Sequence, residues 1–157
     1  MNEISSMLND GCLLTAGNIG DFNTMTINWG LIGNLYQKEV ITVFVRPTRY
    51  TYEFIDKNEY FTLSFFYPSH KTKMSYLGNV SGRDEDKVKK VGLTPIAVNE
   101  SVGFKEAYAT VLCKKIYQEK INVEKLDPKL VKMYNSYGEC HDIDIGQIIQ
   151  TIYNEEA

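Results

Sequence analysis

The order of apolar and polar residues predicts strands along most of the chain. In Phe22–Trp29 the two kinds alternate, so Thr24 and Thr26 would share a polar face that is open to contacts. Gly30 and Gly33 interrupt this pattern. Further strands are predicted at Leu13–Ala16, Glu39–Arg46, Tyr60–Tyr67, Thr94–Val98, Phe104–Ile121 and Gly138–Tyr153. Because strands average only about five to six residues, we expect Phe104–Ile121 to bend or to form a hairpin.

Short helices are predicted between these strands. Pro47 ends one strand and would occupy the first position of a helix at Thr48–Lys57, where its missing N–H costs nothing. Asp127-Pro128 likewise marks the start of a helix that runs to Tyr134. Other short helices are expected at Ile4–Leu8, Ser69–Leu77 and Asp84–Val91. Many strands with short helices between them favour a mainly β fold, a closed or nearly closed β-barrel with peripheral helices, over a doubly wound sheet.

Composition narrows the class of protein. A chain of 157 residues is long enough for one domain with its own core, and we expect a single domain over 1–157. The net charge of -3 argues against a general nucleic-acid binder. We find neither a long apolar run nor a signal-peptide pattern, so we expect no membrane contact and a cytoplasmic location. The three cysteines have no metal-binding spacing and are expected to be reduced thiols.

The segment Arg46-Pro47-Thr48-Arg49-Tyr50-Thr51 has the chemistry of an anion site. It would deliver two guanidinium groups and two hydroxyls to a helix N-terminus, where free N–H groups favour negative charge. Arginine adds paired donors that suit a phosphate. The alternative is that both arginines are solvated and that Thr48 or Thr51 only caps the helix. The residue types alone do not decide between these two interpretations.

Two other segments could complete a ligand site. At Asn28-Trp29-Gly30 the backbone groups of a strand end could meet the edge of a ligand, and the indole could stack on a ring. Packing in a core or an interface is the ordinary role of such a tryptophan. The segment Ser81–Lys87 could form the other half of a phosphate site, with Arg83 and Lys87 four residues apart. A capped surface helix would explain this second segment equally well.

No catalytic motif is present that would supply reactivity without a cofactor. There is no nucleophile elbow, no P-loop, no G-x-G-x-x-G and no H-E-x-x-H. The two histidines, His70 and His141, are too few for a metal site without carboxylates, and a packed histidine is their ordinary role. If the protein is an enzyme, a cofactor is therefore expected to carry the chemistry.

An ordered set of motifs resembles the flavin reductase-like, flavoredoxin-type proteins of the FMN-binding split-barrel superfamily. The resemblance covers about Leu13 to Ile149 and depends on the order of the motifs, because each one alone is weak. The motifs are Leu13–Gly17, Asn23–Thr26 followed by Trp29-Gly30, Val45–Thr51, Phe61–Phe66, and Ser81–Asp84 with Lys87.

This resemblance implies a split β-barrel homodimer that holds FMN near the subunit interface. The phosphate would lie by Arg46, Pro47, Thr48, Arg49 and Thr51. The isoalloxazine edge would lie against Asn28, Trp29 and Gly30, with Thr26 and Ile27 adjacent. Ser81, Gly82 and Lys87 would close the pocket, and Ser64 and Phe65 are further expected contacts. His141 would lie near the flavin face that a nicotinamide or another donor approaches.

The implied activity is that of an FMN-dependent oxidoreductase. It would pass electrons from NAD(P)H or a redox partner to flavin or to another small acceptor. Two alternatives remain at this stage: a noncatalytic FMN-binding electron carrier, and a split-barrel interaction module with an empty pocket. The sequence specifies neither the donor nor the acceptor.

Overall fold

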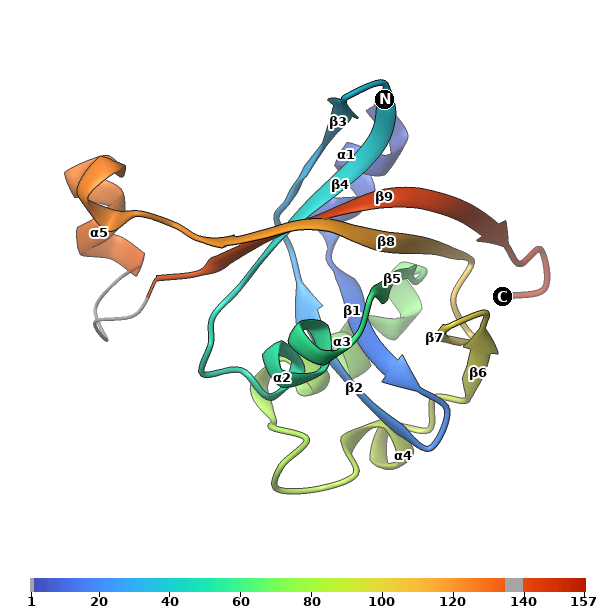
Figure 1. The fold of residues 1–157 in the computed structure, drawn as a ribbon. Helices are drawn as coiled ribbons and strands as arrows, with labels where there is room; N and C mark the ends of the chain where they lie inside the picture. Colours follow the sequence, from blue (N-terminus) through green and yellow to red (C-terminus); the bar gives the residue numbers. More distant parts are fainter. Residues whose placement is uncertain (1, 135–139) are drawn as a thin grey trace.

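The computed structural model describes residues 2–134 and 140–157, and a large antiparallel sheet forms its frame (Figure 1). Its strand order is β2-β1-β5-β8-β9-β4-β3, and β6 and β7 pair separately. The strands are β1 (Cys12–Asn18), β2 (Asp21–Ile27), β3 (Leu31–Leu35), β4 (Lys38–Val45), β5 (Tyr60–Phe65), β6 (Pro95–Val98), β7 (Ser101–Phe104), β8 (Ala109–Lys120) and β9 (Asp142–Tyr153).

Short helices lie around this sheet. They are α1 (Asn2–Asp10), α2 (Tyr50–Lys57), α3 (Lys71–Asn79), α4 (Lys87–Val91) and α5 (Pro128–Tyr134), with 3₁₀ turns at Pro68–His70 and Val123–Lys125. Helices α2 and α3 pack against β1 and β2, whereas α5 stands at the far end of the long β8–β9 ribbon (Figure 1). The mainly β fold with peripheral helices is therefore confirmed.

Two buried clusters hold these elements together. The larger one fills the sheet interior with side chains such as Leu14, Ile41 and Phe61. Gly146 allows β9 to lie directly against this cluster, because a Cβ there would collide with the Phe61 ring. The smaller cluster joins α3 and α4 to the sheet, and it consists of Leu13, Met74, Leu77, Val88, Leu93 and Phe104. This second cluster fixes the loop between α3 and α4 that later forms part of the site.

Several predicted boundaries were wrong. The range Phe104–Ile121 is not one strand: β7 ends at Phe104, and β8 begins at Ala109 after a turn. Register shifts along β8 let its twelve residues stay paired while they bend. The expected strand Gly138–Tyr153 begins at Asp142, and its residues 138 and 139 lie outside the described residues.

Helices α2 and α4 are among those that begin later than predicted. Helix α2 begins at Tyr50, so Pro47 lies in the preceding turn and not at a first helical position. Helix α4 begins at Lys87, because the Asp86 carboxylate caps it by accepting from Lys89 N. The polar face predicted for β2 is also only partly available, since Thr24 is buried and bonds to the Thr15 hydroxyl.

Candidate functional site

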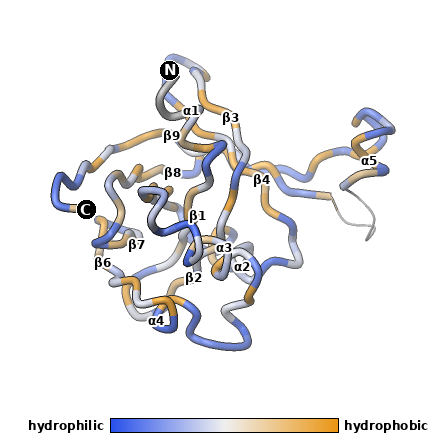
Figure 2. The backbone as a smooth tube through the Cα atoms, turned by 180° about the vertical axis from the view of Figure 1, so that it is seen from behind, coloured by the Kyte–Doolittle hydropathy of each residue, from blue (hydrophilic) through white to orange (hydrophobic). Residues whose placement is uncertain are grey.

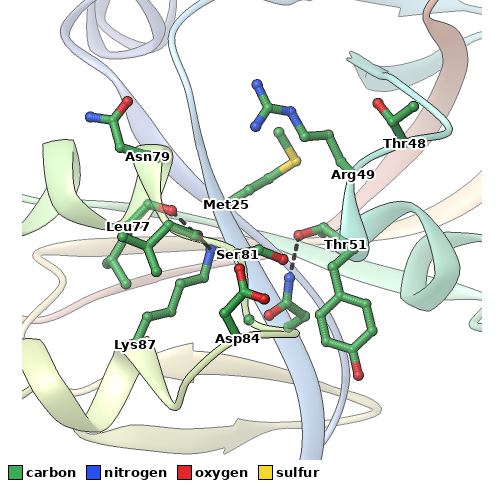
Figure 3. Close-up of a pocket in the computed structure, with 14 residues that line it drawn as sticks. Met25, Thr48, Arg49, Thr51, Leu77, Asn79, Ser81, Asp84 and Lys87 are labelled. Carbon is green, nitrogen blue, oxygen red and sulfur yellow. Dashed lines mark hydrogen bonds between the residues drawn. The ribbon is translucent and has the colours of Figure 1, made fainter.

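Two adjoining cavities contain most of the predicted site residues. The first, here called the anion cavity, has a volume of about 210 Å³ and lies between β2, the start of α2 and the loop after α3 (Figure 3). Its lining residues are Asn23, Met25, Thr48, Arg49, Tyr50, Thr51, Leu77, Gly78, Asn79, Val80, Ser81, Gly82, Asp84 and Lys87.

The second cavity, here called the ring cavity, has a volume of about 270 Å³. It shares Met25 and Arg49 with the anion cavity, so one elongated ligand could occupy both. Its lining residues are Met25, Thr26, Ile27, Asn28, Trp29, Phe44, Arg46, Arg49, Tyr134 and His141.

Lys87 is the buried cation of the anion cavity. Its side chain is only 4% exposed, and its ammonium donates to the carbonyl oxygens of Leu77 (2.9 Å) and Val80 (2.8 Å). Burial, helped by the nearby positive charge of Arg49, lowers the pKa of Lys87 to about 8. No carboxylate pairs with this ammonium within 2–134 and 140–157. An anion in the cavity would supply the missing countercharge.

Arg49 approaches the same cavity from another side. It precedes α2 in an extended conformation, and its side chain extends over the cavity beside Met25 (Figure 3). The Arg49 guanidinium makes no hydrogen bond or ion pair within the described part of the chain, and only the backbone of this residue is bonded. The guanidinium is therefore available to a ligand. Asp84 is the single carboxylate among the residues that line this cavity, so the two cations outnumber it.

Hydroxyl groups and the start of α2 complete the anion cavity. Thr51 lies in the first turn of α2, where backbone N–H groups have no intrahelical acceptor. Its hydroxyl accepts a hydrogen bond of 2.8 Å from Asn23 Nδ2. Ser81 lies on the opposite loop and accepts from the backbone N–H of Arg83. Both hydroxyls border the cavity, so each is placed to meet an anionic oxygen.

Aromatic side chains form the wall of the ring cavity. Trp29 is 45% exposed and stacks on Phe44, with ring centroids 5.3 Å apart and an interplanar angle of 24°. Tyr134 lies 6.1 Å from Trp29, and His141 meets the indole edge-on at 5.1 Å. A half-exposed group of rings beside a cavity is suited to a planar ligand. Core packing alone does not explain the exposed face of Trp29.

His141 borders this ring cavity in an uncharged state at neutral pH. Its pKa is lowered, first by burial and then by the positive charges of Arg46 and Arg49. Neutral imidazole carries one donor and one acceptor nitrogen, so it can contact a ligand edge without adding charge. The structure thus places His141 beside the ring cavity, and its position relative to a flavin stays a prediction.

The two predicted arginines share one cavity but differ in their partners. Arg46 lines the ring cavity, and its guanidinium donates to the backbone carbonyl of Tyr134 at 2.8 Å. Arg49 lies three residues further along a turn and reaches both cavities. Both arginines therefore border the ring cavity, and only Arg49 also borders the anion cavity. That both contact one phosphate stays a prediction.

Other predicted residues lie outside both cavity linings. Ser64 and Phe65 are buried in β5, where Phe65 belongs to the large core cluster. Gly30 lies close to the backbone of Thr42, and neither Gly30 nor Pro47 lines the anion cavity or the ring cavity. Arg83 is not a partner of Lys87 in an anion site, because it bonds to Glu53 at 2.8 Å and to the Thr48 carbonyl.

Several lining residues were missed by the sequence analysis. They include Asn23, Met25, Phe44, Asn79 and Tyr134. Asn23 carried a usable signal, since it is a polar residue within a strand and begins the Asn23–Thr26 motif. Phe44 carried none, because an aromatic residue within a hydrophobic strand is ordinary core material. Tyr134 reaches Trp29 only through the tertiary fold.

Comparisons with known proteins identify the family. Residues 5–157 match the sequence model of the family described as the flavin reductase like domain. The chain belongs to this family. No curated protein matches the chain at a significant level. In the described residues, no helix is long and apolar enough to cross a membrane.

Solved structures share the fold at low sequence identity. Flavoredoxin of Desulfovibrio vulgaris is 24% identical, with a TM-score of 0.73 over 92% of this chain and 69% of that one. The FMN-binding protein from Thermus thermophilus, solved with 1-cyclohex-2-enone, is 18% identical, with a TM-score of 0.71 over 93% and 71%. Nitrilotriacetate monooxygenase component B from Bacillus cereus is 16% identical, with a TM-score of 0.71 over 92% and 69%.

Proposed function

We propose that this protein binds FMN and is an oxidoreductase of the flavin reductase type. It takes electrons from NAD(P)H or from a redox protein and passes them to flavin or to another small acceptor. The observation that carries the proposal is the pair of adjoining cavities that share Met25 and Arg49. One has the cations and hydroxyls that a phosphate needs, and the other has the aromatic wall that a planar ring needs.

The anion cavity fits the phosphate of FMN. Lys87 is a buried ammonium without a carboxylate partner among the residues described, and Arg49 is unpaired there as well. A dianionic phosphate would offset the cost of burying the charge on Lys87. Thr51, Ser81 and the first N–H groups of α2 would donate to its remaining oxygens.

The ring cavity fits the isoalloxazine. Trp29 and Phe44 offer an aromatic wall, and Asn28 is a polar residue on the cavity border. Arg46 and a neutral His141 would lie near the ring and set the local charge. Bound flavin supplies hydride or electron transfer itself, so the chain needs only to bind it, orient it and limit access to it.

The names of structurally similar proteins support this proposal. The family is described by flavin reduction, and the similar structures include a flavoredoxin and an FMN-binding protein. The flavoredoxin similarity also favours the second candidate, a noncatalytic FMN-binding electron carrier. This candidate shares the FMN site and differs only in needing a docked protein in place of a nicotinamide substrate.

Two measurements, made one after the other, test the proposed function. Titration with FMN should quench flavin fluorescence and give a bound-flavin absorption spectrum, whereas a protein that binds no FMN would contradict both candidates. Anaerobic stopped-flow mixing of the FMN complex with NADH or NADPH should then bleach the flavin. Bleaching by dithionite but not by either nicotinamide at millimolar concentration would overturn the reductase and favour the carrier.

We also propose a cytoplasmic homodimer. Support for a dimer comes from exposed apolar residues on α5, where Met133 is 66% and Leu130 is 43% exposed. Figure 2 shows hydrophobic segments on this helix although it stands away from the main body. For the location, support comes from Cys12 and Cys113, which are buried free thiols, as expected in a reducing compartment.

A further inference from the structure

Asn23 occupies a position between the two halves of the anion cavity. It lies on β2, is 7% exposed, and donates from Nδ2 to the Thr51 hydroxyl on α2 at 2.8 Å. Its Oδ1 lies so close to Gly82 that a Cβ at that glycine would collide with it. The side chain therefore links the start of α2 to the loop after α3, which are the two segments that border the cavity.

The bond from Asn23 determines which way the Thr51 hydroxyl can donate. A hydroxyl has one hydrogen and two acceptor sites, and the amide of Asn23 occupies an acceptor site. Within the described residues no protein acceptor takes the hydrogen of the Thr51 hydroxyl. Because Thr51 lines the anion cavity, this hydrogen is left for an anionic oxygen there (Figure 3).

The contact between Asn23 and Gly82 also forms a boundary. Beyond it lies another cavity, of about 450 Å³, which shares Asn23, Tyr50, Gly82 and Lys87 with the anion cavity. Three carboxylates border that second space, those of Asp21, Glu85 and Asp86. In that second space the three carboxylates outnumber the shared Lys87, and Glu85 is paired with Lys90, so this side suits a phosphate less well than the anion cavity.

We propose that Asn23 is a specificity-determining residue that makes the anion cavity select a terminal phosphate monoester. It aims the Thr51 hydroxyl at the phosphate and, with Gly82, closes the cavity toward the acidic space, so that a second phosphate cannot follow the first. This inference depends on the proposed FMN site. It predicts that the protein prefers FMN both to riboflavin, which has no phosphate, and to FAD, which has a pyrophosphate.

The test compares the affinities of FMN, riboflavin and FAD by fluorescence titration. In Asn23→Ala we expect FMN affinity to fall about tenfold, riboflavin affinity to stay unchanged, and the preference for FMN over FAD to narrow. Asn58→Ala is the matched control, because Asn58 Nδ2 makes a 2.7 Å bond at the other end of α2, to Phe54 O, and lines neither cavity. It should leave all three affinities unchanged.

Thr51→Val adds an independent measurement, since it removes the hydroxyl but keeps the shape. It should lower the affinity for FMN and leave the affinity for riboflavin unchanged. In the double variant, Asn23→Ala should add little to the loss of FMN affinity that Thr51→Val causes. If Asn23→Ala does not fold, the same titrations are made with Asn23→Ser and Thr51→Val. Equal losses for FMN and riboflavin, or a wild type that binds FAD as tightly as FMN, would overturn this inference alone. Absence of FMN binding by the wild type would instead overturn the proposed function.

Discussion

At the scale of single residues, Lys87 shows why the anion cavity is suited to a ligand. Its ammonium is buried against two carbonyl oxygens, and both burial and the charge of Arg49 lower its pKa to about 8. Carbonyl oxygens partly solvate an ammonium but do not neutralise it. A lysine held in this way is costly to the empty protein and becomes favourable once a dianion is bound.

Lys87 should therefore affect stability and binding with opposite signs. Without ligand, the pKa in the native state lies below the ordinary value, so stability should rise with pH from about 8 to about 10.5 as the native state releases its proton first. FMN affinity should fall over the same increase, because the charge is lost. Thermal unfolding and FMN titration at pH 7 to 10 measure both effects.

Lys87→Met should remove the pH dependence of both stability and FMN affinity. At pH 7 it should lower FMN affinity by about 10- to 100-fold, because a charged hydrogen bond contributes about 1.5–3 kcal/mol. Lys89→Met, on the exposed side of the same helix, is the control, and it should change neither the pH dependence of stability nor FMN affinity. An unchanged FMN affinity in Lys87→Met would remove Lys87 from the phosphate site.

Arg49 and Arg46 should differ in what they recognise. Arg49 borders both cavities, and its guanidinium has no protein partner among the described residues. Arg46 borders only the ring cavity, and its guanidinium donates to Tyr134 O. Arg49→Ala should weaken FMN by about tenfold or more but should affect riboflavin much less. Arg46→Ala should lower the affinities for FMN and riboflavin by similar factors. If both variants lost FMN and riboflavin equally, the assignment of Arg49 to the phosphate would be wrong.

At the scale of elements, local patterns predicted what is locally determined. β-Branched residues predicted β4 correctly, and the Asp127-Pro128 pair predicted the start of α5, because these preferences act within a few residues. The sequence did not predict β3. Gly33 interrupts the strand pattern there, and the turn that follows has positive φ at Tyr36 and Gln37, where glycine is the usual residue. Tertiary pairing with β4 stabilises that strand instead.

The same limit applies to the site. Sequence motifs brought out Thr51, Ser81 and Lys87, which the structure collects around one cavity. They could not separate Arg46 from Arg49, because the directions of the two side chains depend on a turn whose shape is set by packing. They also could not show that Ser64 is buried, because a strand end in sequence carries no information on what covers it.

The pairing of β8 with β9 buries a carboxylate that should limit stability. Asp144 on β9 is buried and accepts from Gln118 Nε2 on β8 at 2.8 Å, but its Oδ2 has no partner. Burial raises the pKa of Asp144 to about 6. The native state thus binds this proton more tightly than the unfolded chain, so stability should fall as pH rises from about 4 to about 6.

Asp144→Asn should remove this penalty. Its Oδ1 can still accept from Gln118, so we expect a melting temperature that is higher than wild type at pH 7 and similar to it near pH 4. Calorimetry across this range measures the difference. Asp21→Asn, at an exposed position, should follow the wild type at every pH. A variant less stable than wild type at pH 7 would show that the carboxylate has a partner that favours its charged form.

At the scale of the whole molecule, the ring cavity depends on a part of the chain that stands apart. The β8–β9 ribbon carries α5 at its far end (Figure 1). Tyr134 at the end of that helix nevertheless has its ring 6.1 Å from that of Trp29. Exposed Met133 and Leu130 would be covered if a second copy packed on α5. We therefore expect self-association and closure of the ring cavity to be linked.

Substitution of Met133 by Glu tests this link. A carboxylate in an apolar contact would lose its hydration without a partner, so self-association should weaken by about tenfold or more. Sedimentation over a range of concentrations should show a wild-type dimer and a variant that dissociates. FMN affinity should decline at concentrations where the variant is monomeric and recover as it associates. Ile19→Glu, at an exposed apolar position on the turn between β1 and β2, should stay dimeric. A wild type that sediments as a monomer would contradict the dimer, whereas a monomeric variant with full FMN affinity would show that the ring cavity is complete within one chain.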